Sequence, residues 1–243
     1  MLVRLPRSVS EAQSCLAEGA VPVGGATLVW AGWQRDGFPE QAVSLRELPE
    51  AKVIGDGTLG SAVLLHEIDE RVPEVLRKAA GGVGTGAVRR TATVGGNIVG
   101  STLRCLLPAA LVLDARAVVL EADGPVETDL AELLAKRPLL LSLHWREPVA
   151  SGYRKLTDQL RGEVPFVVAA AVGAAEGADA PVLRVAVRDG YDVLSETVPY
   201  DTDTDTGRVL RALALTPLGT LPEGVFEAVR DVVGGVVERA GAR

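Results

Sequence analysis

The pattern of apolar and polar residues in the first fifty positions predicts a helix, a strand and a second helix, in that order. Ser8-Val-Ser-Glu11 has the form of a capping box, so a helix is expected to begin there and to end at Gly19. The apolar stretch 20–25 then predicts a short buried strand that ends in two glycines and leads into the second helix. A further short strand is expected at 41–45.

The pattern in the middle of the chain is typical of an antiparallel sheet. Residues 52–65 predict two strands joined at Asp56-Gly57, a dipeptide that favours tight hairpins. Strands are also expected at 116–122 and 138–145. Helical segments are expected between and before these strands, at 73–84, 106–114 and 128–137.

A third pattern begins near Gly152. Two long and largely apolar segments, 164–174 and 182–190, predict strands. The last segment, 222–241, predicts a helix whose valines recur at helical spacing and are expected to pack in the core: Val225, Val229, Val232 and Val236. The sequence therefore predicts an α+β protein in three parts: an N-terminal α/β lobe over 1–50, a second lobe over 51–150 and a C-terminal sheet-and-helix domain over 151–243.

Composition narrows the class of protein. With 243 residues, of which 47% are hydrophobic, the chain can bury a sizeable core. The net charge is -7 and basic residues are mixed with acidic ones, which argues against nucleic acid or anionic lipid as a partner. No apolar run approaches the roughly 18 residues that a membrane-spanning helix needs, and the first residues do not resemble a signal peptide. We expect a globular cytoplasmic protein.

Residues that bind redox metals or act as nucleophiles are scarce. Two cysteines, Cys15 and Cys105, and two histidines, His66 and His144, lie far apart in the sequence. An iron-sulfur cluster needs about four ligands, so neither a cluster nor a zinc site is indicated, and no metal site is predicted. Both cysteines are interpreted as small apolar core residues, and both histidines as structural residues.

Two Gly-Gly turns are the main candidates for chemistry. The first is in Val23-Gly-Gly-Ala26, ahead of a predicted helix, and the second is in Thr93-Val-Gly-Gly-Asn97. Backbone N–H groups without side chains in the way can approach phosphates closely, and a helix start adds partial positive charge. Glycine pairs also end helices and form bulges for structural reasons alone. If the two turns face one another, they suit the two phosphates of a dinucleotide. There is no G-x-G-x-x-G motif, so a Rossmann site is not indicated.

Five segments carry a resemblance to a known family: "VPVGGATLVW" from residue 21, "VSLRELPEAKVIGDGTLGSAVLLHEI" from residue 43, "GAVRRTATVGGNIVGS" from residue 86, "PAALVLDARAVV" from residue 108 and "SGYRKLTDQLRGEVPFVVAAAV" from residue 151. In this order they resemble the FAD-binding medium subunit or domain of the molybdenum hydroxylases, the group of xanthine dehydrogenase and carbon monoxide dehydrogenase. The resemblance implies FAD as cofactor and a two-lobed flavin fold of the vanillyl-alcohol-oxidase type with a small C-terminal domain.

Carried over by position, the resemblance also implies site residues. The first turn would wrap the diphosphate from one side, and the second turn would act from the other side, near the ribityl and flavin end. Residues of the C-terminal domain would approach the flavin ring, with ordinary strand-flanking positions as the alternative interpretation. The residues concerned are Val23, Gly24, Gly25, Ala26, Thr27 and Leu28 in the first turn, Thr93, Val94, Gly95, Gly96 and Asn97 in the second, and Tyr153, Lys155 and Glu163 in the C-terminal domain.

The sequence departs from the family after the second turn. The family usually has Ser-Pro-x-x-Asp there, and its aspartate bonds the ribityl chain; here Leu106 stands at the place of the acid. Losing one charge-assisted hydrogen bond typically costs about 1.5 to 3 kcal/mol, which need not abolish binding. Arg104 either substitutes by reaching a phosphate or is solvated.

Three functions follow, in order of preference. The first is a flavin oxidoreductase subunit that relays electrons between the iron-sulfur clusters of a partner and an external acceptor, in a complex with a molybdopterin subunit. The second is a stand-alone flavin oxidoreductase acting on a small organic substrate. The third is a flavin-free scaffold. Either a partner subunit or self-association is expected to cover an incompletely covered site. Trp30, Trp33 and Phe38 are candidates for that interface, and core packing is their alternative interpretation.

Overall fold

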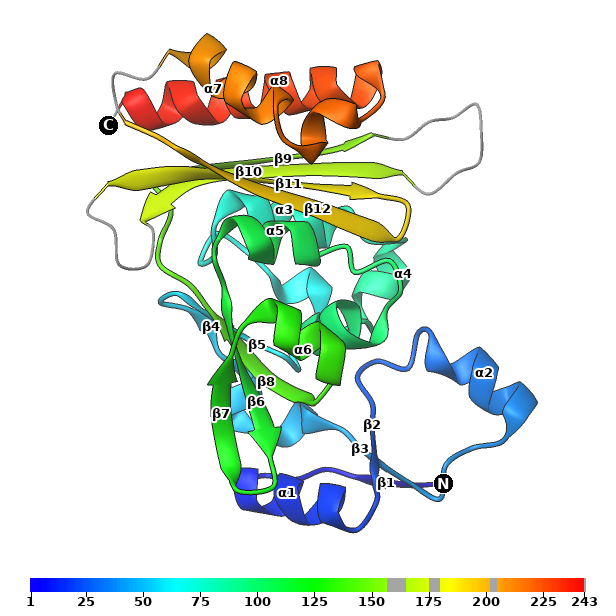
Figure 1. Cartoon of the computed structure of the whole chain (residues 1–243). Coiled ribbons are helices and arrows are strands. Elements are labelled where there is room, and N and C mark those ends of the chain that lie inside the picture. The colour runs from blue at the N-terminus through cyan, green and yellow to red at the C-terminus, as the bar shows by residue number, and fades with distance from the viewer. Residues whose placement is uncertain (157–164, 175–179, 202–204, 243) are drawn as a thin grey trace. The chain divides into compact units, whose positions relative to one another are not determined.

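The computed structural model describes residues 1–156, 165–174, 180–201 and 205–242, and its strands form three sheets (Figure 1). The first sheet has three parallel strands in the order β1 (Leu2–Arg4), β3 (Gln41–Val43), β2 (Val21–Pro22). Helix α1 (Val9–Ala17) begins as predicted, because the Ser8 hydroxyl accepts a hydrogen bond from the Glu11 amide. It ends at Ala17, two residues before Gly19, whose φ is +83°.

The segment after α1 differs from the prediction in one respect. Strand β2 forms, but both of its residues are exposed, so the expectation of a buried strand is wrong. The helix that follows, α2 (Val29–Asp36), contains no buried residue. The apolar residues of β2 and α2 are therefore not buried in the core of the described chain.

The second sheet is antiparallel, as predicted, and has the strand order β4-β5-β8-β6-β7. Its β4–β5 hairpin turns at Asp56 and Gly57, which both adopt positive φ, so the predicted Asp-Gly turn is confirmed. The strands are β4 (Ile54–Gly55), β5 (Thr58–Gly60), β6 (Arg116–Glu121), β7 (Gly124–Thr128) and β8 (Leu139–His144). The helices of this region are α3 (Glu74–Gly81), α4 (Gly86–Arg89), α5 (Leu107–Val112) and α6 (Leu130–Lys136).

The third sheet is an antiparallel meander in the order β12-β11-β10-β9. Its strands are β9 (Ala150–Leu156), β10 (Phe166–Ala174), β11 (Pro181–Asp189) and β12 (Asp192–Pro199). Helices α7 (Thr206–Ala214) and α8 (Glu223–Gly241) lie on one face, and α3 and α5 lie on the other (Figure 1). The four valines predicted to be core residues of the last helix are all buried, which confirms that prediction: Val225, Val229, Val232 and Val236.

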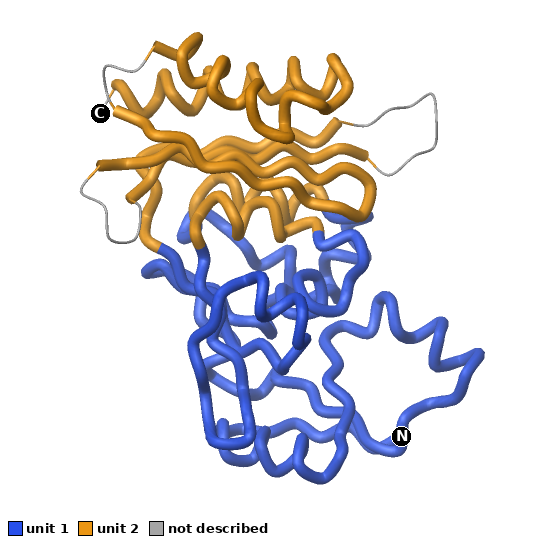
Figure 2. Tube along the Cα trace, viewed as in Figure 1, with its two compact units in different colours: residues 1–72, 83–104, 115–145 blue, residues 73–82, 105–114, 146–243 orange. Residues whose placement is uncertain are grey.

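The chain divides into two compact units (Figure 2). Unit 1 contains the first two sheets and comprises 1–72, 83–104 and 115–145. Unit 2 contains the third sheet, and it also takes α3 and α5 from the middle of the chain. The three-part division at residues 50 and 150 stays a prediction of the sequence. Within the described residues, no helix is long and apolar enough to cross a membrane.

Candidate cofactor-binding site

The first Gly-Gly turn leaves a row of backbone donors open. It joins β2 to α2, and the Val23 amide fixes its start by donating to the Val43 carbonyl (2.9 Å). Ala26 adopts a left-handed φ of +56°, a conformation uncommon for a residue with a side chain. Among the residues that the structure describes, no protein acceptor receives a hydrogen bond from the N–H groups of residues 24–28. Consecutive free amides around a left-handed residue form a concave site for an anion.

The backbone donors of the second Gly-Gly turn, by contrast, are hydrogen-bonded within the protein. Thr93 and Asn97 are buried, and the four amides of residues 94–97 all donate within the protein. Their acceptors are the carbonyl of Val63 (3.0 Å), the carbonyl of Ser61 (2.8 Å), the Oγ1 of Thr93 (3.1 Å) and the carbonyl of Thr93 (2.9 Å), in that order. The second turn is thus held in place by hydrogen bonds to neighbouring protein groups, and the amides of residues 94–97 already have protein acceptors.

The two turns lie against one another, as expected for a dinucleotide site. A Cβ on Gly24 would stand 2.2 Å from Thr93 Oγ1, and a Cβ on Gly25 would stand 1.7 Å from the carbonyl oxygen of Thr91. Real Cβ atoms do not approach so closely, so packing between the turns already requires glycine at both positions. Close approach of a phosphate is therefore not needed to explain the glycine pair, although the open amides remain beside it.

The charge of the first turn is compatible with a diphosphate. Residues 21–34 contain no acidic or basic side chain, so no carboxylate of this segment repels an anion. The five residues 24–28 are partly or fully exposed. The turn also leads directly into α2, whose N-terminus contributes partial positive charge.

The segment after the second turn contains Arg104 and Leu106. Arg104 has a φ of +40°, and its Nε atom is buried without a hydrogen-bond partner in the described structure. A buried donor of this kind is costly unless something pairs with it. Leu106 is fully buried where α5 begins, in unit 2, so its side chain belongs to the core.

The predicted residues of the C-terminal part lie in unit 2 and are described within that unit alone. The Lys155 ammonium donates to the Gly82 carbonyl (2.7 Å), at the end of α3. Burial raises the pKa of the Tyr153 phenol to about 12; the Cys105 thiol adds to the rise and Arg188 opposes it. Glu163 lies outside the described residues.

Sequence reasoning missed a buried arginine in unit 2. Arg188 on β11 is only 1% exposed, and its guanidinium donates to the Cys105 sulfur (3.1 Å) and to the Pro165 carbonyl (2.7 Å). The interpretation of Cys105 as an apolar core residue is therefore wrong, because this thiol is half-buried and accepts from a cation. Cys15 is 2% exposed in an apolar cluster, which confirms that interpretation for the other cysteine. The signal available in the sequence was a pair of arginines, Arg184 and Arg188, within the otherwise largely apolar segment 182–190.

Comparison with known families decides the class of this site. Residues 3–143 match the model of the FAD binding domain in molybdopterin dehydrogenase. The chain belongs to this family. The FAD expected from the sequence is thus the cofactor of the family, and the predicted family is confirmed. The match covers both Gly-Gly turns of this FAD-binding domain. No protein of curated function matches the sequence significantly.

Solved structures confirm the fold of this FAD-binding protein. A chain of quinoline 2-oxidoreductase from Pseudomonas putida 86 superposes with a TM-score of 0.74 at 16% identity, over 99% of this chain and 98% of that one. A chain of a Cu,Mo-CO dehydrogenase gives 0.71 at 18% identity, over 100% and 98%. A CO dehydrogenase from Hydrogenophaga pseudoflava that lacks the Mo-pyranopterin moiety gives 0.69 at 16% identity, over 100% and 97%. These likenesses confirm the predicted two-lobed flavin fold with its C-terminal domain.

Proposed function

We propose that this chain holds FAD through the turn 23–28 and, in the cytoplasm, relays electrons between the iron-sulfur clusters of a partner subunit and an external acceptor. The observation that carries the proposal is the row of unbonded amides at residues 24–28 in a member of an FAD-binding family. A row of free amides in a charge-free turn has a ready ligand in the diphosphate of FAD.

Each part of the site has a separate task in this proposal. Val23, whose amide donates to the Val43 carbonyl of β3, anchors the turn, and the open amides from Gly24 to Leu28 bind the diphosphate oxygens. Thr93 lies behind the turn, where its hydroxyl accepts from the Gly96 amide and contacts Gly24, and so fixes the direction of the donors. Arg104 supplies a further donor to the phosphates through a guanidinium whose Nε lacks a protein partner. Asn97 serves the flavin end, and the role expected of Lys155 stays a prediction of the sequence.

The relay role rests on the chemistry of the cofactor and on the names of the relatives. Bound FAD supplies hydride and single-electron transfer, which lets a protein connect two-electron and one-electron carriers. The name of the family and the names of two similar proteins refer to molybdenum or molybdopterin enzymes. We infer that the molybdopterin centre and the iron-sulfur clusters reside on partner subunits and that this chain contributes the flavin.

A charge placed at the turn tests the binding mode. Thr27 is exposed, so Thr27→Glu adds a negative charge beside the proposed diphosphate without disturbing the core. Repulsion by a nearby unit charge at a protein surface is worth about 2 kcal/mol, or about thirtyfold in Kd. Thr27→Gln is the matched neutral control and is expected to bind FAD as the parent does. FAD affinity is measured calorimetrically at low salt. Equal affinity of the two variants would show that the diphosphate does not bind at this turn.

Reduction experiments test the relay. If partner subunits supply the electrons, a reducing substrate bleaches the flavin absorbance only when the iron-sulfur and molybdopterin subunits are present. Bleaching by a small organic molecule with this chain alone would replace the relay with a stand-alone oxidoreductase. A folded protein that does not bind added FAD would indicate a flavin-free scaffold instead.

A further inference from the structure

Exposed apolar side chains are concentrated in the first 38 positions of the described chain, which include the open turn. Of the thirteen large apolar side chains that are exposed among the described residues, eight lie within the first 38 positions. Trp30 is 48% exposed and Phe38 is 44% exposed, so the interpretation of these aromatic residues as core packing is wrong. The eight residues are Met1, Leu2, Val3, Val21, Leu28, Val29, Trp30 and Phe38.

Trp30 is fixed close to the turn. Its amide donates to the Ala26 carbonyl (3.1 Å), so the indole stands on the first turn of α2, directly after the open amides. Its ring meets that of Phe38 in a T-shaped contact with centroids 5.2 Å apart. Phe38 also contacts Trp33, with centroids 6.1 Å apart. The indole is thus supported from one side while nearly half of its surface stays accessible.

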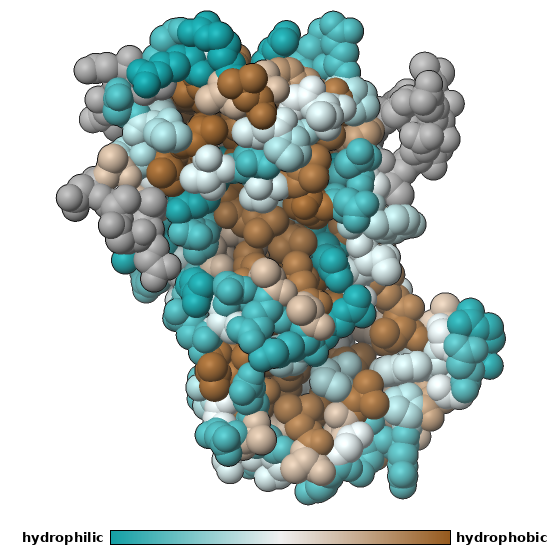
Figure 3. Space-filling model, viewed as in Figure 1, coloured by the Kyte–Doolittle hydropathy of each residue, from teal (hydrophilic) through white to brown (hydrophobic). Residues whose placement is uncertain are grey.

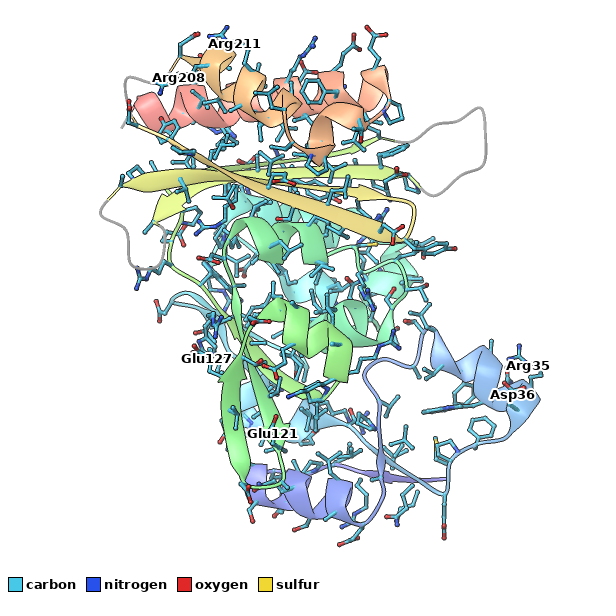
Figure 4. All side chains as sticks on the ribbon, in the orientation of Figure 1. Arg35, Asp36, Glu121, Glu127, Arg208 and Arg211 are labelled. Atoms are coloured by element: carbon cyan, nitrogen blue, oxygen red, sulfur yellow. The ribbon has the colours of Figure 1, made fainter. Side chains whose placement is uncertain are left out.

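The surroundings of Trp30 favour an uncharged ring as its partner. On the face drawn in Figure 3, hydrophilic colour on the α2 segment is concentrated at the outer end of the helix. There Arg35 and Asp36 neutralise one another in an ion pair of 2.7 Å (Figure 4). The opposite end of α2, where Trp30 lies, carries no charge and adjoins the anion site. An anion site beside an exposed indole suits a ligand that has a flat base attached to phosphate.

We propose that Trp30 stacks on the adenine of FAD, an inference that rests on the proposed function of turn 23–28. Adenine is separated from the diphosphate by a single ribose, whereas the flavin is separated by the five-carbon ribityl chain. The ring nearest to the bound diphosphate is therefore adenine. Aromatic side chains bind bases through their faces, which needs no charge and no hydrogen bond. Trp30 thereby determines affinity for the adenosine half of the cofactor.

ADP, which carries adenine and a diphosphate but no flavin, is the direct probe. ADP is expected to quench tryptophan fluorescence of the flavin-stripped protein and to compete with FAD. Trp30→Leu is expected to abolish the quenching and to weaken both FAD and ADP about tenfold. Trp30→Phe retains an aromatic face and is expected to restore most of the affinity. Inorganic pyrophosphate, which has no base, is expected to bind the parent and Trp30→Leu equally.

Trp33→Leu is the matched control, because it removes an indole from the same helix and the same aromatic cluster. This variant is expected to keep the ADP quenching and the FAD affinity. If the parent binds FAD and Trp30→Leu binds it equally well, the adenine contact is refuted while the proposed function stands. A change of oligomeric state in Trp30→Leu at unchanged FAD affinity would also refute it, in favour of a protein interface. If the folded parent fails to bind FAD, the proposed function and this inference fall together.

Discussion

Contact between the two Gly-Gly turns makes a quantitative prediction about Gly24 and Thr93. An alanine Cβ at position 24 would lie 2.2 Å from Thr93 Oγ1, but 3.4 Å from Thr93 Cβ and 3.5 Å from Thr93 Cγ2. The clash therefore involves one oxygen atom, and the other two distances are ordinary contacts. Gly24→Ala is expected to destabilise the fold by about 1–3 kcal/mol, the usual cost of overpacking.

Removing that oxygen should relieve the clash. Thr93→Ala alone is expected to cost about 1 kcal/mol, because the half-buried Gly96 amide loses its acceptor. In the double variant the Cβ at position 24 no longer meets the oxygen, so the two costs should not add. We expect a favourable coupling of about 1.5 kcal/mol, within the range known for residues in contact.

Urea unfolding of the four proteins of this cycle, without FAD, gives the coupling free energy, provided that the m value stays constant. Thr93→Ser is the decisive control, because serine keeps the hydroxyl oxygen and should give no relief to Gly24→Ala. Gly32→Ala, whose Cβ would meet nothing within 4 Å in α2, should be neutral or slightly stabilising. Additive costs in the cycle, or equal rescue by serine, would refute the contact between the turns.

Two further predictions concern unit 2. Leu106→Asp restores the acid of the family at a fully buried position, so it is expected to lower the free energy of unfolding by at least about 3 kcal/mol. It is not expected to tighten FAD binding. Thermal melting measures the first effect and FAD titration the second. The raised pKa of Tyr153 stabilises the fold fully below pH 10, and this contribution is lost as pH rises toward about 12. Tyr153→Phe should therefore show a smaller loss of stability between pH 9 and 11.5 in urea unfolding, and an unchanged loss would contradict the burial of the phenol.

Local features of the fold could be predicted from the sequence. The capping interaction of Ser8 with Glu11 and the hairpin at Asp56-Gly57 depend on residues within four positions of one another, so short motifs describe them fully. The spacing of the valines in α8 also predicts their burial, because an amphipathic helix faces the nearest sheet with its apolar side.

Features that depend on distant segments could not be predicted in the same way. The Gly95 amide donates to the carbonyl of Ser61, more than thirty residues earlier in the chain. A short motif therefore does not reveal that the amides of the second turn are hydrogen-bonded within the protein. The apolar character of β2 and α2 predicts burial, but burial depends on what covers a segment, and Trp30 is left exposed. Arg188 reaches Cys105 across 83 positions, a pairing that neither residue signals alone.

The central claim is that the open amides of residues 24–28 hold FAD, and calorimetric titration of the flavin-stripped protein with FAD tests it most directly. The account predicts one FAD bound per chain, with an affinity that falls in the presence of inorganic pyrophosphate, since both ligands require the same amides. A folded protein that takes up no FAD, or that binds FAD with an affinity unaffected by pyrophosphate, would contradict it.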